Sequence, residues 1–346
     1  MSGTSTQLEI TGLDPFDDAE FDEFHAVYEA AESFGREATA TPWERGELRV
    51  AMREEARRRF RHGLCGRVDG RIVVTGAVEG SLLDNLDIGE VRVHTLPEAR
   101  RQGHGSAMVA ECEQVARERG RTTLLGMCDW PFSGHPEGDG EPGIEFARKH
   151  GYAMALVEIQ RRLDLPVEEE TLDRLAADAA AHHAGYTLRS WSGPVPEELV
   201  QGWAEVTSTL MTEAPMGDIE REPQVADPQV VRESEALAFA QGRELYATAA
   251  LDEDGTVVAY TNFGVNNEGS PRAYQWGTLV RPEHRGHRLG IAVKVANLRQ
   301  LQRERPDLGQ VVTWNAEVNS HMVGVNEAIG FVPVERSGEV QKRLGG

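Results

Sequence analysis

The chain has 346 residues, 40% of them hydrophobic, and a formal net charge of −21. This length suits about two domains, and so acidic a surface argues against nucleic acid or an anionic membrane as a partner. The sequence has no apolar run long enough to cross a bilayer, no signal-peptide pattern and no close cysteine pair, so it predicts a cytoplasmic protein without a transmembrane segment, disulfide framework or metal site.

The first half of the chain predicts a hairpin, then alternating strands and helices. Two strand-like runs meet at Asp69-Gly70, a dipeptide typical of tight hairpin turns. Apolar side chains then recur on one helical face from Met108 to Ala116, and Cys112 on that face is expected to be a small buried residue. The expected strands are 62–70, 71–80, 89–96, 122–130 and 153–163, with one helix ending near Gly120 and a short one ending at Gly151-Tyr152.

A helix is expected between the halves, because the acidic run 168–170 precedes an apolar and alanine-rich stretch. We therefore expect an N-terminal domain at 1–165, a linker helix at 166–185 and a C-terminal domain at 186–346. His182 and His183 in the linker are adjacent and cannot share a helix face, so they are interpreted as solvated rather than as metal ligands.

The second half repeats the order of the first. Its hairpin turns at Asp254-Gly255, and its second short helix ends at Gly330-Phe331. With an offset of 185 residues, Pro97, Glu98, Arg100 and Gly105 fall on Pro282, Glu283, Arg285 and Gly290. A repeat of this length indicates two copies of one fold rather than a single large domain.

The repeated segment is a strand, a turn rich in Arg and Gly, and a helix. The first amides of a helix have no internal partner and lie at the positive end of its dipole, so they favour an anion. Gly103 and Gly105 would let a phosphate approach the backbone closely. Neither copy has the Gly-Lys-Ser/Thr of a P-loop, and Met108 stands where a dinucleotide-binding motif needs its third glycine.

The pattern Arg-x-x-Gly-x-Gly after a strand resembles motif A of the GNAT acetyltransferases, with Arg100, Gly103 and Gly105 matching it. In the second copy Arg285 and Gly290 match. Arg288 replaces the middle glycine, at a position where helical dihedral angles would not require one. The downstream stretch from Asn319 to Phe331 resembles motif B. The tandem layout is similar to that of mycothiol synthase.

This resemblance implies an α/β (α+β) protein with two GNAT folds in tandem, each a mixed, mostly antiparallel twisted sheet flanked by helices. It also implies acetyl-CoA as cofactor, with the pantetheine between two splayed strands. The residues expected to bind it are Val93, Thr95, Arg100, Arg101, Gly103, His104, Gly105 and Ser106 in the first half, and Leu279, Val280, Arg285, Gly286, His287, Arg288, Leu289, Gly290, Asn319 and Asn326 in the second.

The catalytic residues that the resemblance implies are incomplete in both halves. The family's carboxylate on the strand before motif A would be Glu90 in the first half, and its aligned residue in the second is Gln275. Glu317 could substitute there. The family's tyrosine on the motif B helix is replaced by Ala147 and Asn326. The candidates are therefore Glu90, Glu317 and Asn326, and the intact motif B favours the second half as the catalytic one.

The function implied is transfer of an acetyl group from acetyl-CoA to a primary amine of a small molecule by direct attack. Glu213, Asp218, Glu220 and Glu222 lie in a segment where carboxylates would attract a cationic amine, although a solvated loop explains them as well. The missing tyrosines keep an alternative open, a non-catalytic acyl-CoA sensor or scaffold. The chain is expected to be a monomer or a homodimer.

Overall fold

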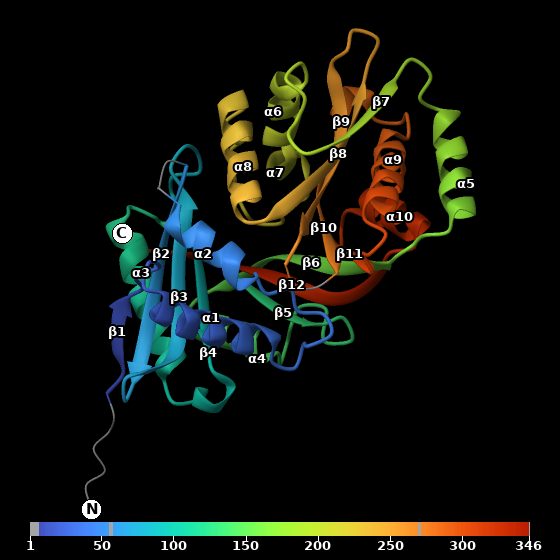
Figure 1. The fold of residues 1–346 in the computed structure, drawn as a ribbon. Coiled ribbons are helices and arrows are strands. Elements are labelled where there is room, and N and C mark those ends of the chain that lie inside the picture. The colour runs from blue at the N-terminus through green and yellow to red at the C-terminus, as the bar shows by residue number, and fades with distance from the viewer. Residues whose placement is uncertain (1–6, 55–57, 269–270, 346) are drawn as a thin grey trace, which may run out of the picture. The chain divides into compact units, whose positions relative to one another are not determined.

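The computed structural model describes residues 7–54, 58–268 and 271–345. These residues form two compact units, which are described separately. Unit 1 comprises the chain up to Val157 together with the chain from Arg336 onward, and unit 2 comprises Glu158–Glu335 (Figure 1).

Unit 1 is a mixed sheet with helices on both faces. Its strands run in the order β1-β2-β3-β4-β5-β12, antiparallel from β1 to β4 and parallel between β4 and β5. Its elements are β1 (Glu9–Gly12), α1 (Asp18–Ser33), α2 (Arg45–Arg53), β2 (Arg59–Val68), β3 (Arg71–Ser81), β4 (Ile88–Thr95), the 3-10 turn η1 (Pro97–Ala99), α3 (His104–Glu118), β5 (Thr123–Pro131), α4 (Pro142–Lys149), and parts of β6 (Ala153–Asp164) and β12 (Val332–Arg343).

Neighbouring residues of β2 show how unit 1 divides its core between the two faces. Leu64 packs in the cluster that contains Met108 and Cys112 of α3, whereas Cys65 packs in the cluster that contains Phe24 of α1. Adjacent strand residues point to opposite faces, so α1 and α3 cover opposite sides of the sheet. Cys112 is fully buried, which confirms its predicted place in the core.

The hairpin between β2 and β3 turns at Asp69 and Gly70, as predicted. Both residues have positive φ values, 52° and 81°, which is the geometry of the tight turns that match the twist of antiparallel strands. The predicted hairpin of the second half is formed by β8 (Arg243–Leu251) and β9 (Val257–Asn266), whose loop contains Asp254 and Gly255.

Unit 2 repeats the architecture. Its strands run β6-β11-β10-β9-β8-β7, and β10 and β11 are the parallel pair. Two apolar clusters pack around this sheet, one with α9 and α5 and the other with α6. The further elements are α5 (Glu169–Ala180), β7 (Thr187–Ser192), α6 (Val200–Ser208), α7 (Leu210–Glu213), α8 (Pro228–Ala240), β10 (Arg272–Val280), the 3-10 turn η2 (Pro282–His284), α9 (Leu289–Glu304), β11 (Gln310–Ala316) and α10 (Ser320–Ile329).

Two strands, β6 and β12, are divided between the units. β6 starts in unit 1, and its second part pairs with β11 from Glu158↔Ala316 to Asp164↔Gln310. β12 starts in unit 2, and from Arg336 onward it belongs to unit 1, where Val340 lies in the core. The expected boundary at residue 165 falls at the end of β6, whereas the contacts divide the chain within that strand. The cause is the exchange of these two strands, which the repeat in the sequence does not reveal.

Helix α5 occupies the segment where a linker helix was expected. Its residues Leu172, Leu175 and Ala179 are buried in the cluster that contains Val295 and Leu298 of α9, so α5 is a packed part of unit 2. His182 follows this helix and is exposed.

Candidate functional site: two strand-to-helix corners

The first corner joins β4 to α3 in unit 1. After β4 and η1 the backbone takes positive φ values at Arg101 (65°) and Gly103 (92°), and α3 starts at His104. Gly103 is the N-cap and provides no side-chain cap. The amides of the first turn of α3 therefore have no partner within the helix and can bind an anion.

Gly105 brings three elements together at this corner. A Cβ atom on Gly105 would lie 3.2 Å from Oγ1 of Thr95 on β4 and 3.3 Å from a ring carbon of Phe146 on α4. A Cβ on Gly103 would meet no atom within 4 Å, so that side of the turn is open. The glycines therefore have different roles: Gly105 permits close packing, and Gly103 supplies the left-handed turn that aims the amides.

The basic side chains at the first corner are largely uncommitted. Arg101 is exposed, and neither it nor His104 forms a hydrogen bond or ion pair with any residue that the structure describes. Arg100 instead donates to the carbonyl oxygens of Thr95 and Ala31, at 3.2 Å each, and lies over the ring of Phe34. Arg100 thus braces the turn, while Arg101 and His104 remain available to a ligand.

The second corner joins β10 to α9 in unit 2. Arg288 is the N-cap of α9, with a φ of 54° in the left-handed region. The expectation that this position takes helical dihedral angles is therefore wrong, because the chain turns through the left-handed region at both corners. An arginine in that conformation is strained by about 1–2 kcal/mol. The amides after Arg288 still lack a side-chain cap, and a Cβ on Gly290 would meet only Val280, at 3.8 Å.

The basic side chains of the second corner all contact other parts of unit 2. The partners come from α5, α6, α7 and the segment after α5. Such surface pairs each contribute about 0–1 kcal/mol, so a diphosphate could displace them, but they compete with it. The contacts are Arg281–Glu205 at 3.1 Å, Arg285–Glu213 at 2.8 Å, Arg288–Asp178 at 2.6 Å, His284 Nδ1 with the Tyr186 hydroxyl at 2.9 Å, and His287 Nδ1 with the His182 carbonyl at 3.1 Å.

Beside each corner the two parallel strands separate. The register of β4 and β5 joins Ile88–Glu90 to Thr123–Leu125, and both strands continue beyond it, to Thr95 and Pro131. The register of β10 and β11 likewise stops at Gln275↔Thr313 while β10 continues to Val280. Each unit thus has strand backbone past the end of a ladder, next to its helix N-terminus.

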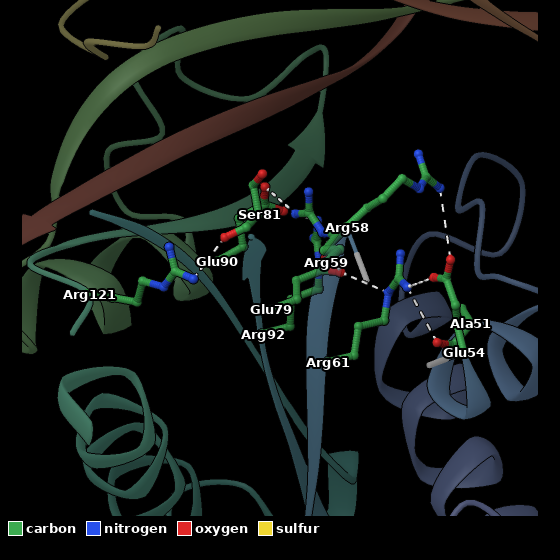
Figure 2. A network of polar contacts seen from close by, with 10 residues as sticks. All are labelled: Ala51, Glu54, Arg58, Arg59, Arg61, Glu79, Ser81, Glu90, Arg92 and Arg121. Atoms are coloured by element: carbon green, nitrogen blue, oxygen red, sulfur yellow. Dashed lines mark hydrogen bonds and ion pairs between the residues drawn. The ribbon is translucent and has the colours of Figure 1, made fainter. Parts of the chain in front are cut away.

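Glu90 lies in a network of charged side chains on β2, β3 and β4 (Figure 2). Its Oε1 accepts a hydrogen bond from Arg59 at 2.6 Å, and Arg92 lies at 3.8 Å from its other oxygen. Arg59 also donates to Glu79 at 3.1 Å. Burial lowers the pKa of Arg59, but Glu90 and Glu79 outweigh it and raise that pKa. Glu90 is therefore held as a guanidinium partner, and a proton accepted there would weaken this ion pair.

A histidine and a carboxylate missed by the sequence reasoning lie between β4 and α1. Nε2 of His94 is 3.3 Å from Glu32, and the His94 ring meets Tyr28 edge-on at 4.9 Å. Burial raises the pKa of Glu32, but the hydrogen bonds and charges of His94 and Arg36 outweigh it and lower that pKa to about 2. In the sequence, the one signal for this pair is that His94 lies three residues before Pro97 of the repeated segment.

Glu90 and Gln275 are not structural counterparts, contrary to the alignment. Val91 packs in the cluster around α3, so its neighbour Glu90 points to the opposite face. Gln275 instead bonds to Lys294 on α9, the helix that corresponds to α3. A β-bulge between Gln275 and Thr278 shifts the register of β10 by one residue, and a one-residue shift exchanges the two faces.

The most unusual group in unit 2 is Lys294, which is only 2% exposed. Its Nζ donates to Oε1 of Gln275 and to Oδ1 of Asn326, at 2.7 Å each. Burial lowers the pKa of this ammonium to about 7. Sequence reasoning missed Lys294, although a lysine between apolar residues on the inner face of a predicted helix was a signal that could have found it.

Of the other candidates in the second half, Asn326 belongs to this buried group. Asn319 is the N-cap of α10 and accepts from the amide of Met322 at 3.2 Å. Glu317 is exposed in the turn after β11. The side chains of Leu279 and Leu289 are buried, so only their backbone can face a ligand.

Among the described residues, no three His, Cys, Asp or Glu side chains are grouped as metal ligands. In the same residues, no helix combines the length and the apolar character that a membrane span requires.

Comparison with known proteins links both corners to one family. The model of the acetyltransferase (GNAT) family matches residues 24–152 and again 204–331. Mycothiol acetyltransferase from Geodermatophilus obscurus is 26% identical over 294 residues, which cover 81% of this chain and 84% of that protein.

Solved structures agree with this match. A tandem GNAT protein from the clavulanic acid biosynthesis pathway is 28% identical, with a TM-score of 0.77 over 98% of this chain and 99% of that one. A GCN5-related N-acetyltransferase from Sphaerobacter thermophilus has a TM-score of 0.64 at 14% identity, covering 97% of this chain and 95% of that one, and so shares the fold.

Proposed function

The chain belongs to the acetyltransferase (GNAT) family and is an N-acetyltransferase, and we propose that it transfers the acetyl group of acetyl-CoA to a primary amine of a small molecule. The observation that carries this proposal is the first corner. There a left-handed glycine leaves the amides of α3 uncapped beside two basic side chains that bond to none of the described residues. In a chain with a net charge of −21, such a local concentration of donors and positive charge supports a binding site for a polyanion.

At the first corner the proposed contacts divide between diphosphate and pantetheine. The amides from Gly103 to Ser106, with the side chains of Arg101 and His104, would bind the diphosphate. Val93 and Thr95, on β4 beyond the end of its ladder with β5, would lie along the pantetheine. At the second corner the amides at the start of α9, at Leu289 and Gly290, likewise have no side-chain cap. Arg285, His287 and Arg288 would first have to leave their present partners.

The proposed reaction is a direct attack by the amine nitrogen on the thioester carbonyl. The amine must be neutral to attack, and an alkyl amine is mostly protonated near pH 7. A group in the protein or a water chain must therefore accept its proton. Glu90 is engaged with Arg59, and Glu317 is exposed in the turn after β11, so neither is favoured as that group by its contacts.

The names of two relatives support a small molecule as the acceptor. One is a mycothiol acetyltransferase, and the other comes from the clavulanic acid biosynthesis pathway. Both names refer to the chemistry of small molecules.

The test is release of free thiol from acetyl-CoA in the presence of a panel of small primary amines, with the acetylated product identified by mass spectrometry. The proposal expects at least one amine to accelerate thiol release and to gain one acetyl group. Tight binding of acetyl-CoA without turnover of any amine in a broad panel would contradict it and would favour a sensor.

A further inference from the structure

A chain of polar side chains crosses the opening between β10 and β11 in unit 2. Asn315 on β11 accepts from Nδ2 of Asn326 on α10, at 2.5 Å. Asn326 and Gln275 on β10 both accept from Lys294, at 2.7 Å. The chain therefore links the two strands just where their ladder ends, at Gln275↔Thr313.

The outer ends of the chain fix which atoms face Lys294. Nε2 of Gln275 donates to Oγ1 of Thr261 at 2.7 Å, so the carbonyl oxygen of Gln275 is the atom turned toward Nζ. Nδ2 of Asn326 is likewise used by Asn315, which leaves its oxygen for Nζ. Two of the four tetrahedral positions around Nζ thus hold donated hydrogens, and a third is its bond to carbon. The fourth can hold either a proton or a lone pair while the same two hydrogen bonds are kept.

Among the residues that the structure describes, no carboxylate forms an ion pair with Lys294, and burial alone shifts its pKa. Helix α9 packs against α5, α10 and the strands β7 to β10. The charged side chains of α5, α10 and β7 are exposed, β9 carries no charged residue, and Glu244 on β8 pairs with Arg305 at 3.1 Å. Arg272 is the charged residue of β10, at the strand's opposite end from Val280. The ring of Phe331 also lies near Nζ, with its centre at 5.6 Å.

The first unit shows that the fold does not need this lysine. Val109 and Ala147 stand where the second half has Lys294 and Asn326, and both are buried in an apolar core. A charged lysine that is buried without a counter-charge destabilises a protein by several kcal/mol, and the neutral amine avoids this cost. Its presence in only one of two copies of the fold indicates a role in chemistry rather than in packing.

We propose that Lys294 protonates the sulfur of coenzyme A as that thiol leaves the acetyl group in the second half. This inference rests on the proposed function. The amine nitrogen forms its bond to the carbonyl carbon while the carbon–sulfur bond breaks. The electron pair of that bond stays on sulfur, which takes the proton from the fourth position of Nζ. The proton that the amine loses passes to solvent, and solvent returns one to Lys294, so the sum is amine plus thioester to amide plus thiol.

The test variant is Lys294→Val combined with Asn326→Ala, which installs the pair already tolerated in the first unit. The second variant is Lys294→Gln, which keeps a hydrogen-bond donor at this position but removes the group that gains and loses a proton. The matched control is Lys149→Val, a lysine at the end of α4 in unit 1. Turnover is measured from pH 6 to 9, and binding of free coenzyme A is followed by calorimetry and by the ultraviolet absorbance of thiolate.

The expected result is a fall in kcat of about 100-fold in both Lys294 variants, the range typical of a lost proton donor, with KM for acetyl-CoA little changed. The decline of kcat above about pH 7 in the native protein should disappear, because that limb reports loss of the proton from Lys294. The thiol of bound coenzyme A should lose its proton at a lower pH in the native protein and in Lys149→Val than in the Lys294 variants, because Nζ can donate a hydrogen bond to the thiolate.

The thiolate measurement needs no acceptor, so it judges Lys294 even if every amine fails and the proposed function falls. Native turnover with unchanged kcat and pH profile in both Lys294 variants would overturn the inference while leaving the proposed function intact. A bound thiol that ionises at the same pH in the native protein and in both Lys294 variants would overturn it as well.

Discussion

Individual residues at the first corner decide what can bind there. Gly103 takes a φ of 92° and leaves open space beside it, whereas Gly105 is closely packed between Thr95 and Phe146. Arg101 adds an exposed charge that pairs with no residue in the described part of the chain. A diphosphate at this turn would receive helix amides and charged donors together, which is a stronger anion site than either alone.

Reversing the charge of Arg101 tests that arrangement without crowding the turn. Arg101→Glu should weaken acetyl-CoA binding at the first corner by about 10- to 100-fold, because a charged hydrogen bond of about 1.5–3 kcal/mol is replaced by repulsion. Calorimetric titration measures the affinity and the number of sites. Arg303→Glu, whose side chain is 71% exposed in α9, makes the same charge change elsewhere and should bind as the native protein does. Equal affinities for all three proteins would contradict a diphosphate site at Arg101.

Which residues of the site could be foreseen depends on whether their role is local. The corner glycines and arginines lie within a few positions of one another, so the sequence displays their spacing directly. The Arg59–Glu90 ion pair joins residues 31 positions apart. The Lys294–Gln275–Asn326 group joins residues 19 and 32 positions apart that come from three different elements. No local pattern announces such contacts, because they depend on strand register and helix packing.

At the scale of elements, two features of the strands govern the sites. The bulge in β10 turns Gln275 toward α9, so the second unit has an amide and a lysine where the alignment placed a counterpart of Glu90. The exchange of β6 and β12 places the last strand of the sequence in the first unit. Alternating apolar residues were enough to predict which segments are strands. They could not predict the single inserted residue that shifts the register of β10.

The exchange predicts that a mutation near the C-terminus weakens the first unit. Val340 on β12 is 3% exposed and belongs to the core that contains Val91 and Leu124, so Val340→Ala should lower the free energy of unfolding by about 1–3 kcal/mol. Hydrogen exchange should rise in α3 and β5. Val332→Ala, in the same strand but 48% exposed, should leave both unchanged. A loss of protection confined to α9 and β11 would contradict the placement of β12 in unit 1.

At the scale of the whole molecule, the sequence repeat predicts two copies of one fold, and the family model matches both halves. The repeat hides how the copies have diverged. The first has an uncommitted basic corner over an apolar core, and the second has a tethered corner over a buried polar group. These differences arise from residues that the common motif does not contain.

The central claim is that the strand-to-helix corners bind the diphosphate of acetyl-CoA. A crystal structure of the protein soaked with acetyl-CoA tests it most directly. The account predicts the diphosphate against the first amides of α3, next to Arg101, and the thioester beside the strand residues that follow the end of the β4–β5 ladder; in the second unit, any bound cofactor should place its sulfur near Lys294. A cofactor whose diphosphate lies away from both helix N-termini would contradict the account.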